Sequence, residues 1–186
     1  MRRLSVFNSV SLDGYFTDAR GDMSWAHRND PEWIEFTQSN AKSEGMMLFG
    51  RKTYDMMNSF WPTPAAAQMM PEVAKRMNSA QKIVFSRTLN EATWENARVI
   101  SGDIVAAAQQ LKHESGPDML LMGSGEIIAQ LTAAKLIDQY QIVTVPVVIG
   151  FGRTMFEGVP EKLELERVDS RSFSNGNIVN TYSPKP

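Results

Sequence analysis

Residues 119–128 constrain the fold of this chain more than any other stretch. Residues 119–122 are Met-Leu-Leu-Met, an apolar run typical of a buried strand. Gly123, Ser124 and Gly125 then turn the chain, and Glu126 and Ile127 begin a segment with helical apolar spacing. A strand, a glycine turn and a helix aim backbone N–H groups at an anion, most often a nucleotide phosphate. The same pattern also forms ordinary tight connections, and the third glycine of the dinucleotide fingerprint is absent, since Ile128 takes its place.

A second stretch has the same organisation. Residues 46–49, Met-Met-Leu-Phe, predict a buried strand, and Gly50 follows directly. Arg51 and Thr53 would then lie at a helix N-terminus, where a guanidinium and a hydroxyl both reach a phosphate. A solvated Arg and a helix-starting Thr are the alternative. Ser86 and Arg87 follow a third apolar run, residues 82–85, and fit either a phosphate contact or an exposed turn.

Alternation and turn signals predict the remaining elements. Further strands are expected at residues 4–10, 98–100 and 138–145, and a hairpin near the C-terminus turns at residues 174–177. One helix is expected to begin at Asp30-Pro31, and others are expected over residues 71–80 and 103–114, the latter capped by Ser101. A further helix should run from Glu126 to about residue 134. Loops are expected over residues 15–29 and 58–67. The pattern indicates one α/β domain spanning residues 1–186: a three-layer fold whose mostly parallel central sheet is flanked by helices and ends in an antiparallel hairpin.

Composition excludes several classes of function. The chain of 186 residues has a formal net charge of −2 and no long run of one sign, so nucleic acid and a membrane surface are not expected partners. It has no cysteine, which excludes disulfides and thiolate nucleophiles. Its two histidines are far apart, so no metal site is expected. No apolar run approaches the ~20 residues of a membrane span, and we expect a cytoplasmic protein.

Four segments resemble the dihydrofolate reductase-like superfamily in order and spacing. They are residues 9–14 (Ser-Val-Ser-Leu-Asp-Gly), 50–53 (Gly-Arg-Lys-Thr), 82–87 (Lys-Ile-Val-Phe-Ser-Arg) and a block from Gly123 that ends in Pro-Val-Val-Ile-Gly-Phe-Gly-Arg-Thr-Met-Phe at 146–156. Within that superfamily the chain is most similar to the reductase domain of bacterial bifunctional riboflavin-biosynthesis deaminase–reductases. The resemblance spans nearly the whole chain, but the deaminase half and its zinc motif are absent.

This resemblance implies NADPH as cofactor and a small heterocycle, aminouracil- or pterin-like, as substrate. Carried over by position, the pyrophosphate and ribose phosphates would contact Gly50, Arg51 and Thr53, and the adenosine 2′-phosphate would lie between Ser86 and Arg87. A second pyrophosphate contact, beside the nicotinamide, would come from Gly123, Ser124, Gly125, Glu126 and Ile127. The resemblance also implies a homodimer, with residues 146–156 and the last strands as its interface.

The catalytic group is less well defined by the sequence. Asp13 is the first candidate for a polar substrate contact or proton relay and Glu35 the second, although Asp before Gly is also ordinary turn chemistry. The first helix does not align cleanly with the segment that carries the folate-binding carboxylate in folate reductases, and Asp30, Glu32 and Glu35 are all possible counterparts. Trp25, Trp33 and Phe36 form either a stacking wall for a flat ring or part of the core. The sequence therefore leaves open two further functions. One is a non-catalytic nucleotide-binding protein that keeps the fold, and the other is a reductase that uses flavin or NADH; Ser86 and Arg87 argue against NADH.

Overall fold

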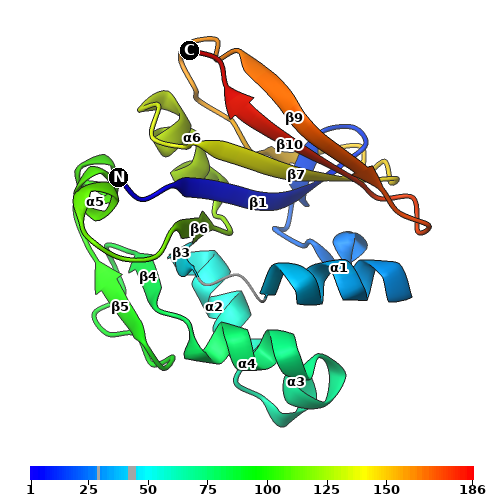
Figure 1. Ribbon diagram of the computed structural model, residues 1–186, viewed down its shortest axis with the longest axis horizontal. Coiled ribbons are helices and arrows are strands. Elements are labelled where there is room, and N and C mark those ends of the chain that lie inside the picture. The colour runs from blue at the N-terminus through cyan, green and yellow to red at the C-terminus, as the bar shows by residue number, and fades with distance from the viewer. Residues whose placement is uncertain (29, 42–44) are drawn as a thin grey trace.

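The computed structural model describes every residue of the chain except residues 29 and 42–44. Its eight-stranded sheet has the order β5-β4-β3-β6-β1-β7-β10-β9 (Figure 1). The strands are β1 (Leu4–Ser11), β3 (Met46–Gly50), β4 (Lys82–Phe85), β5 (Ala97–Ile100), β6 (Met119–Leu121), β7 (Gln139–Val145), β9 (Leu165–Ser172) and β10 (Ile178–Pro184). In this order, each strand from β5 through β4, β3, β6 and β1 to β7 is parallel to the next. Strand β10 is antiparallel to both β7 and β9. The predicted fold class, a mostly parallel sheet with an antiparallel C-terminal hairpin, is confirmed.

Helices cover both faces of the sheet (Figure 1). They are α1 (Pro31–Ala41), α2 (Arg51–Phe60), α3 (Pro64–Met69), α4 (Pro71–Ser79), α5 (Ile104–His113) and α6 (Gly125–Ala133), with a short 3-10 turn η1 (Ser24–Ala26). Apolar residues of α5 and α6 pack on one face, and those of α2, α4 and α1 pack on the other. These helices bury the central parallel strands from both sides, which is why β3 and, after Lys82, β4 are apolar without polar alternation.

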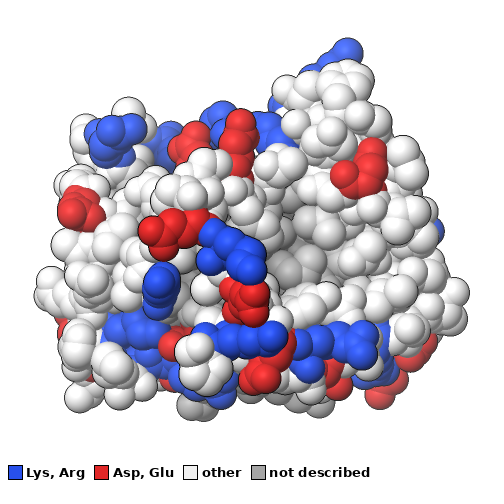
Figure 2. All heavy atoms as spheres, turned by 90° about the horizontal axis from the view of Figure 1, so that it is seen from above, with Lys and Arg blue, Asp and Glu red and all other residues white. Residues whose placement is uncertain are grey.

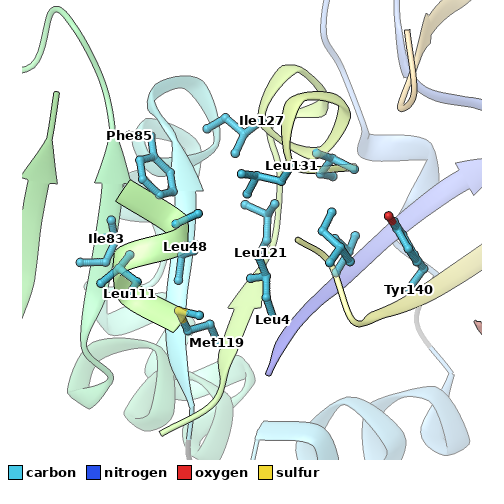
Figure 3. Close-up of a cluster of buried hydrophobic side chains, with 14 of the residues drawn as sticks. Leu4, Leu48, Ile83, Phe85, Leu111, Met119, Leu121, Ile127, Leu131 and Tyr140 are labelled. Atoms are coloured by element: carbon cyan, nitrogen blue, oxygen red, sulfur yellow. The ribbon is translucent and has the colours of Figure 1, made fainter. Parts of the chain in front are cut away.

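The largest core cluster lies between the sheet and helices α5 and α6 (Figure 3). Leu4, Leu48, Ile83 and Leu121 point into it from four different strands, and Leu131 reaches it from α6 (Figure 3). All five side chains are at most 1% exposed. Burying a Leu or Ile side chain contributes about 1.5–3 kcal/mol, so this cluster fixes the central strands and with them the loops at their ends.

Strand β1 separates from one of its neighbours partway along. It pairs with β6 only from Leu4 to Val6, whereas it pairs with β7 from Ser5 to Ser11. Beyond Val6 the side of β1 that faces β6 therefore has no strand partner. Such an opening at the carboxyl end of parallel strands is where open α/β sheets bind ligands.

Three sequence predictions about local structure are wrong. The loop expected over residues 15–29 contains strand β2 (Tyr15–Asp18), which pairs with β8 (Gly152–Thr154), while Asn29 itself lies outside the described residues. The loop expected over residues 58–67 contains the end of α2 and the start of α3, because Thr63 caps α3 and Pro64 occupies its first position. The cap of α5 is Asp103, not Ser101, since the Asp103 carboxylate accepts the N–H groups of Val105 and Ala106.

Strand β9 forms one edge of the sheet and is almost wholly exposed. It carries Glu166, Arg167, Asp169 and Arg171, so both signs of charge alternate along it. Figure 2, which views the molecule from above Figure 1, shows Lys and Arg interspersed with Asp and Glu, without a broad area of one sign. Charged side chains on an edge strand oppose its pairing with a further strand.

Candidate active site

The residues predicted to bind the cofactor lie at the carboxyl ends of neighbouring strands. Ser86 and Arg87 follow β4, the first glycine junction (residues 50–53) follows β3, and the second glycine junction (residues 123–127) follows β6. Because β4, β3 and β6 are adjacent and parallel, these three segments meet at one edge of the sheet. Asp13 follows β1, the next strand in the same order.

The two glycine junctions are in direct contact. The backbone N–H of Gly50 donates to the carbonyl oxygen of Gly123 at 2.9 Å. A Cβ added to Gly50 would lie 2.6 Å from Ser124 Oγ and 2.9 Å from Ile127 Cδ1. Glycine at position 50 therefore allows α2 and α6 to begin side by side.

Gly123 occupies the centre of the site. Its φ is +109°, a conformation that favours glycine, and the peptide bond to Ser124 is cis. A Cβ at Gly123 would lie 3.0 Å from Thr53 Oγ1 and 3.7 Å from Asn8 Nδ2. The turn is thus enclosed by α2 on one side and β1 on the other.

Helices α2 and α6 both begin without a side-chain cap. Their N-cap residues are Gly50 and Ser124, and neither side chain accepts a hydrogen bond from the first turn. In contrast, Asp30 accepts the N–H of Trp33, and Thr63 and Asp103 cap α3 and α5. Helix α4 also begins without a side-chain cap, but it does not start at a glycine junction. Uncapped first-turn N–H groups and the positive end of the helix dipole attract anions. Two such helix starts in contact are suited to a diphosphate.

The basic residues of the site have different surroundings. Arg51 is half-buried, and its Nε donates to Asp55 Oδ2 at 2.6 Å. Arg87 is exposed and forms no ion pair with the part of the chain that the structure describes. Ser86 is buried, and its hydroxyl accepts the N–H groups of Thr88 and Leu89 at 3.2 and 3.0 Å. Ser86 therefore shapes the turn that presents Arg87 at the strand end.

The remaining residues of the second junction connect it to the small β2–β8 sheet. A Cβ at Gly125 would lie 2.8 Å from a ring carbon of Phe16, and Ile127 is 3% exposed. Glu126 is exposed and faces the Arg153 guanidinium at 3.4 Å. Strand β8 thus places a positive charge near the N-terminus of α6.

Asp13 holds two loops together. Its carboxylate accepts the N–H of Gly150 at 2.8 Å and that of Ile149 at 3.2 Å. Hydrogen bonds from the Ser11 hydroxyl and then from these backbone groups hold the pKa of Asp13 below its ordinary value. The structure therefore gives Asp13 the turn-holding role that the sequence left as an alternative; its catalytic role stays a prediction.

The carboxylates of α1 are directed mainly to the C-terminal hairpin. Asp30 Oδ2 accepts from the Ser174 hydroxyl at 3.0 Å, and Glu32 accepts the Ser174 N–H at 3.2 Å and lies 3.3 Å from Arg171. The Ser174 N–H, followed by Arg171, lowers the pKa of Glu32. Glu35 is exposed and has no hydrogen bond or ion pair among the described residues. No polar contact brings Glu35 to the glycine junctions.

The aromatic residues considered for stacking belong to a core cluster. Trp33 and Phe36 each lie 5.0 Å from Phe173 between ring centroids. Trp25 packs against the same cluster, which is built on Val143 of β7. These rings fix η1, α1 and the hairpin to the sheet.

Asn8 is a site residue that the sequence analysis missed. It lies on β1 beside Gly123 and is 6% exposed. A signal was present, because Leu4 and Val6 alternate with polar or half-buried residues and point into the core, and Asn8 continues their face of the strand. A polar residue near the carboxyl end of an apolar strand face indicates either a buried hydrogen bond or a ligand contact.

Neither a metal cluster nor a membrane-spanning helix is present in the described ranges. No group of three or more His, Asp or Glu side chains gathers there in a way that could hold a metal ion. Likewise, none of the described helices is long and apolar enough to cross a bilayer.

Three solved structures share this architecture. A putative riboflavin biosynthesis protein from Shewanella sp. PV-4 has a TM-score of 0.74 and 25% identity, with each chain fully covered. The bifunctional deaminase/5-amino-6-(5-phosphoribosylamino)uracil reductase of Thermotoga maritima has a TM-score of 0.70 and 16% identity over 99% of this chain and 57% of its own. Dihydrofolate reductase from Enterococcus faecalis, complexed with NADP(H), has a TM-score of 0.67 and 14% identity over 99% of this chain and 97% of its own. The dihydrofolate reductase-like fold expected from the sequence is confirmed.

The family comparison covers almost the whole chain. The family described as the RibD C-terminal domain matches residues 2–179, which include both glycine junctions, Ser86 and Arg87. This chain therefore belongs to the RibD C-terminal domain family, a reductase family.

Proposed function

We propose that the chain is an NADPH-dependent reductase that transfers hydride to a small heterocycle. One observation carries the proposal: two uncapped helix N-termini, those of α2 and α6, lie in contact at the carboxyl edge of a parallel sheet. A dinucleotide needs such donors for its two phosphates. Membership of a reductase family supports the same function.

The residues present fit NADPH along this edge. The strand order β4-β3-β6-β1 places four groups next to one another along the sheet: Arg87, the first junction, the second junction and Asn8. Four adjacent strands span about 14 Å between the outer two, an extent suited to an elongated dinucleotide. Arg87 would hold the 2′-phosphate that distinguishes NADPH from NADH, because its guanidinium forms no ion pair with the described residues. Gly50 lets the first turns of α2 and α6 lie close enough together to hold both phosphates.

Bound NADPH would supply the hydride, and the chain's own residues would bind, orient and exclude water. The first turns of α2 and α6 would hold the diphosphate. Gly123, between Thr53 and Asn8, would lie beside the reacting ring. Asp13 stays the first candidate for a proton relay, followed by Glu35, and positioning accounts for most of the catalysis that the site can offer.

An aminouracil- or pterin-like ring is the proposed substrate class. The Thermotoga maritima protein is named as an aminouracil reductase, and the Shewanella protein as a riboflavin biosynthesis protein. We extend that chemistry to this chain as a proposal, since one fold supports many substrates.

A non-catalytic nucleotide-binding protein is the second candidate. The positions of the two candidate carboxylates favour it, because Asp13 already accepts two backbone N–H groups and Glu35 is exposed on α1. NADPH binding without reduction of any pyrimidine or pterin tested would support this second function.

The test is calorimetric titration of the wild-type protein and two variants with NADPH and with NADH. Because Arg87 would contact only the 2′-phosphate, Arg87→Ala should weaken NADPH about 10–100-fold and leave NADH unchanged. Arg51→Ala should weaken both nucleotides, because both carry the diphosphate. Arg167→Ala, on the distant edge strand β9, is the matched control and should alter neither. Absence of nucleotide binding to the wild-type protein would overturn the proposal.

A further inference from the structure

Asn8 lies where β1 loses its partner on one side. Strand β6 pairs with β1 only as far as Val6, whereas its contact with β3 continues one residue further, where the Met122 N–H donates to the Leu48 carbonyl. Asn8 is the next residue of β1 on the same face as Leu4 and Val6. It therefore stands at the opening beside Gly123.

The orientation of the Asn8 amide is determined by its own strand. The Ser9 N–H donates to Asn8 Oδ1 at 2.9 Å, which identifies that atom as the oxygen, because an N–H can donate only to an acceptor. Nδ2 consequently points the other way, and it has no hydrogen-bond partner among the described residues. It lies 3.7 Å from the position that a Cβ of Gly123 would occupy.

The Asn8 amide nitrogen is accessible from this opening. Asn8 is 6% exposed, whereas Leu4 and Val6 on the same face of β1 are fully buried. Among the described residues, Nδ2 is not one of the fully buried side-chain atoms that lack a partner, so the small exposed part of Asn8 includes it. A donor that its own strand holds in place and leaves unpaired at an opening suits an acceptor that binds in front of Gly123.

We propose that Asn8 Nδ2 donates a hydrogen bond to the carboxamide oxygen of the nicotinamide and thereby orients the ring beside Gly123. This inference rests on the proposed function and deepens it. Next to β6, which leads into α6, the sheet continues with β1. With the diphosphate held at α2 and α6, the nicotinamide end of the dinucleotide would lie beside β1. The carboxamide offers a carbonyl acceptor to the unpaired Nδ2.

A comparison of two nucleotides distinguishes this contact from the other contacts of the site. NADPH carries the nicotinamide, whereas 2′-phosphoadenosine diphosphoribose has the same phosphates and no nicotinamide ring. Each is titrated by calorimetry into the wild-type protein and into Asn8→Leu and Asn8→Ser. Asn180→Leu is the matched control, because Asn180 lies in the same row of the sheet, two strands from Asn8. Circular dichroism and the thermal midpoint of each variant show that it is folded.

Both Asn8 variants should weaken NADPH about five- to tenfold, the effect of one lost hydrogen bond, and leave the nicotinamide-free nucleotide unchanged. Asn180→Leu should change neither. A structural role for Asn8 would weaken both nucleotides equally, and that result, or unchanged binding of both, would overturn the inference while leaving the proposed function intact. If the wild-type protein binds neither nucleotide, the proposed function fails and this inference fails with it.

Discussion

Gly50 is the residue on which the contact between the two glycine junctions depends. Its N–H reaches the carbonyl of Gly123, and no side chain stands between it and Ser124. Any Cβ at this position would meet Ser124 Oγ at 2.6 Å, a distance that carbon and oxygen do not tolerate. The requirement for glycine comes from a neighbour 74 positions later in the chain and not from its own backbone conformation, which is extended.

Gly50→Ala should therefore destabilise the protein and separate the two helix starts. Overpacking of this kind costs about 1–3 kcal/mol, and NADPH affinity should fall with it. Urea unfolding of Gly50→Ala, Ser124→Gly and the double variant measures the coupling between the two positions. Because Ser124→Gly removes the nearest atoms, Gly50→Ala should cost less in that background. An equal cost in both backgrounds would show that Ser124 is not the obstructing group.

At the scale of elements, Asp13 joins the end of β1 to the segment between β7 and β8. Its carboxylate is the acceptor for the N–H groups of Ile149 and Gly150, and the Leu12 N–H donates to the Val147 carbonyl nearby. These contacts fix the loop from which β8 continues to its pairing with β2. A turn-holding role and a proton-relay role for Asp13 make different predictions.

Asp13→Ala should accelerate hydrogen exchange at the Ile149 and Gly150 amides, because both lose their acceptor. Asp13→Asn keeps an oxygen at the same place and should retain most of the protection. Hydrogen exchange followed by mass spectrometry or NMR measures both. Unchanged exchange in Asp13→Ala would remove the turn-holding role and strengthen the catalytic candidate.

The sequence predicted the parallel elements well because their signals are local. Residues 46–49, 82–85 and 119–122 are short, mostly apolar runs followed by turn residues, and each contains a largely buried strand. The β2–β8 pair was missed, because three-residue β8 has no periodicity of its own and its partner lies more than 130 positions earlier. Helix α3 was missed because Pro62 and Pro64 were interpreted as loop residues, although Pro64 begins the helix.

The candidate site was predictable to the same extent. Glycines and basic residues after apolar runs mark strand ends, so the cofactor residues could be found one segment at a time. That Gly50 and Gly123 touch depends on strand order, which no local pattern contains. Asn8 was missed for a related reason: the alternation along β1 places it on the face of Leu4 and Val6, but no local pattern shows the turn that it faces.

At the scale of the whole molecule, the homodimer implied by the resemblance stays a prediction. Leu12, Val148 and Phe151 are 66–69% exposed and belong to the two loops that Asp13 joins. Exposed apolar residues gathered in this way favour an interface. Strand β9, with its alternating charges, is poorly suited to edge pairing (Figure 2).

Analytical ultracentrifugation should therefore find a species of twice the 20.8 kDa chain mass. Phe151→Glu places a charge in the exposed apolar loops and should shift the protein toward the monomer. Met69→Glu is the matched control, because Met69 is 66% exposed on α3 and lies outside the proposed interface. A monomeric wild-type protein, or equal dissociation by both substitutions, would contradict the interface.

The proposed nucleotide lies across the two glycine junctions. A groove at the amino ends of the strands, opposite the glycine junctions, is an alternative binding site. It has a volume of about 420 Å³ and is lined by residues that include Arg2, Lys82 and Arg98. Backbone amide shifts of the ¹⁵N-labelled wild-type protein, recorded during titration with NADPH, distinguish the two directly. We expect the largest shifts at residues 50–53 and 123–127, with smaller ones at Asn8 and Arg87. Shifts gathered around Arg2 and Arg98, or none at saturating NADPH, would contradict this proposal.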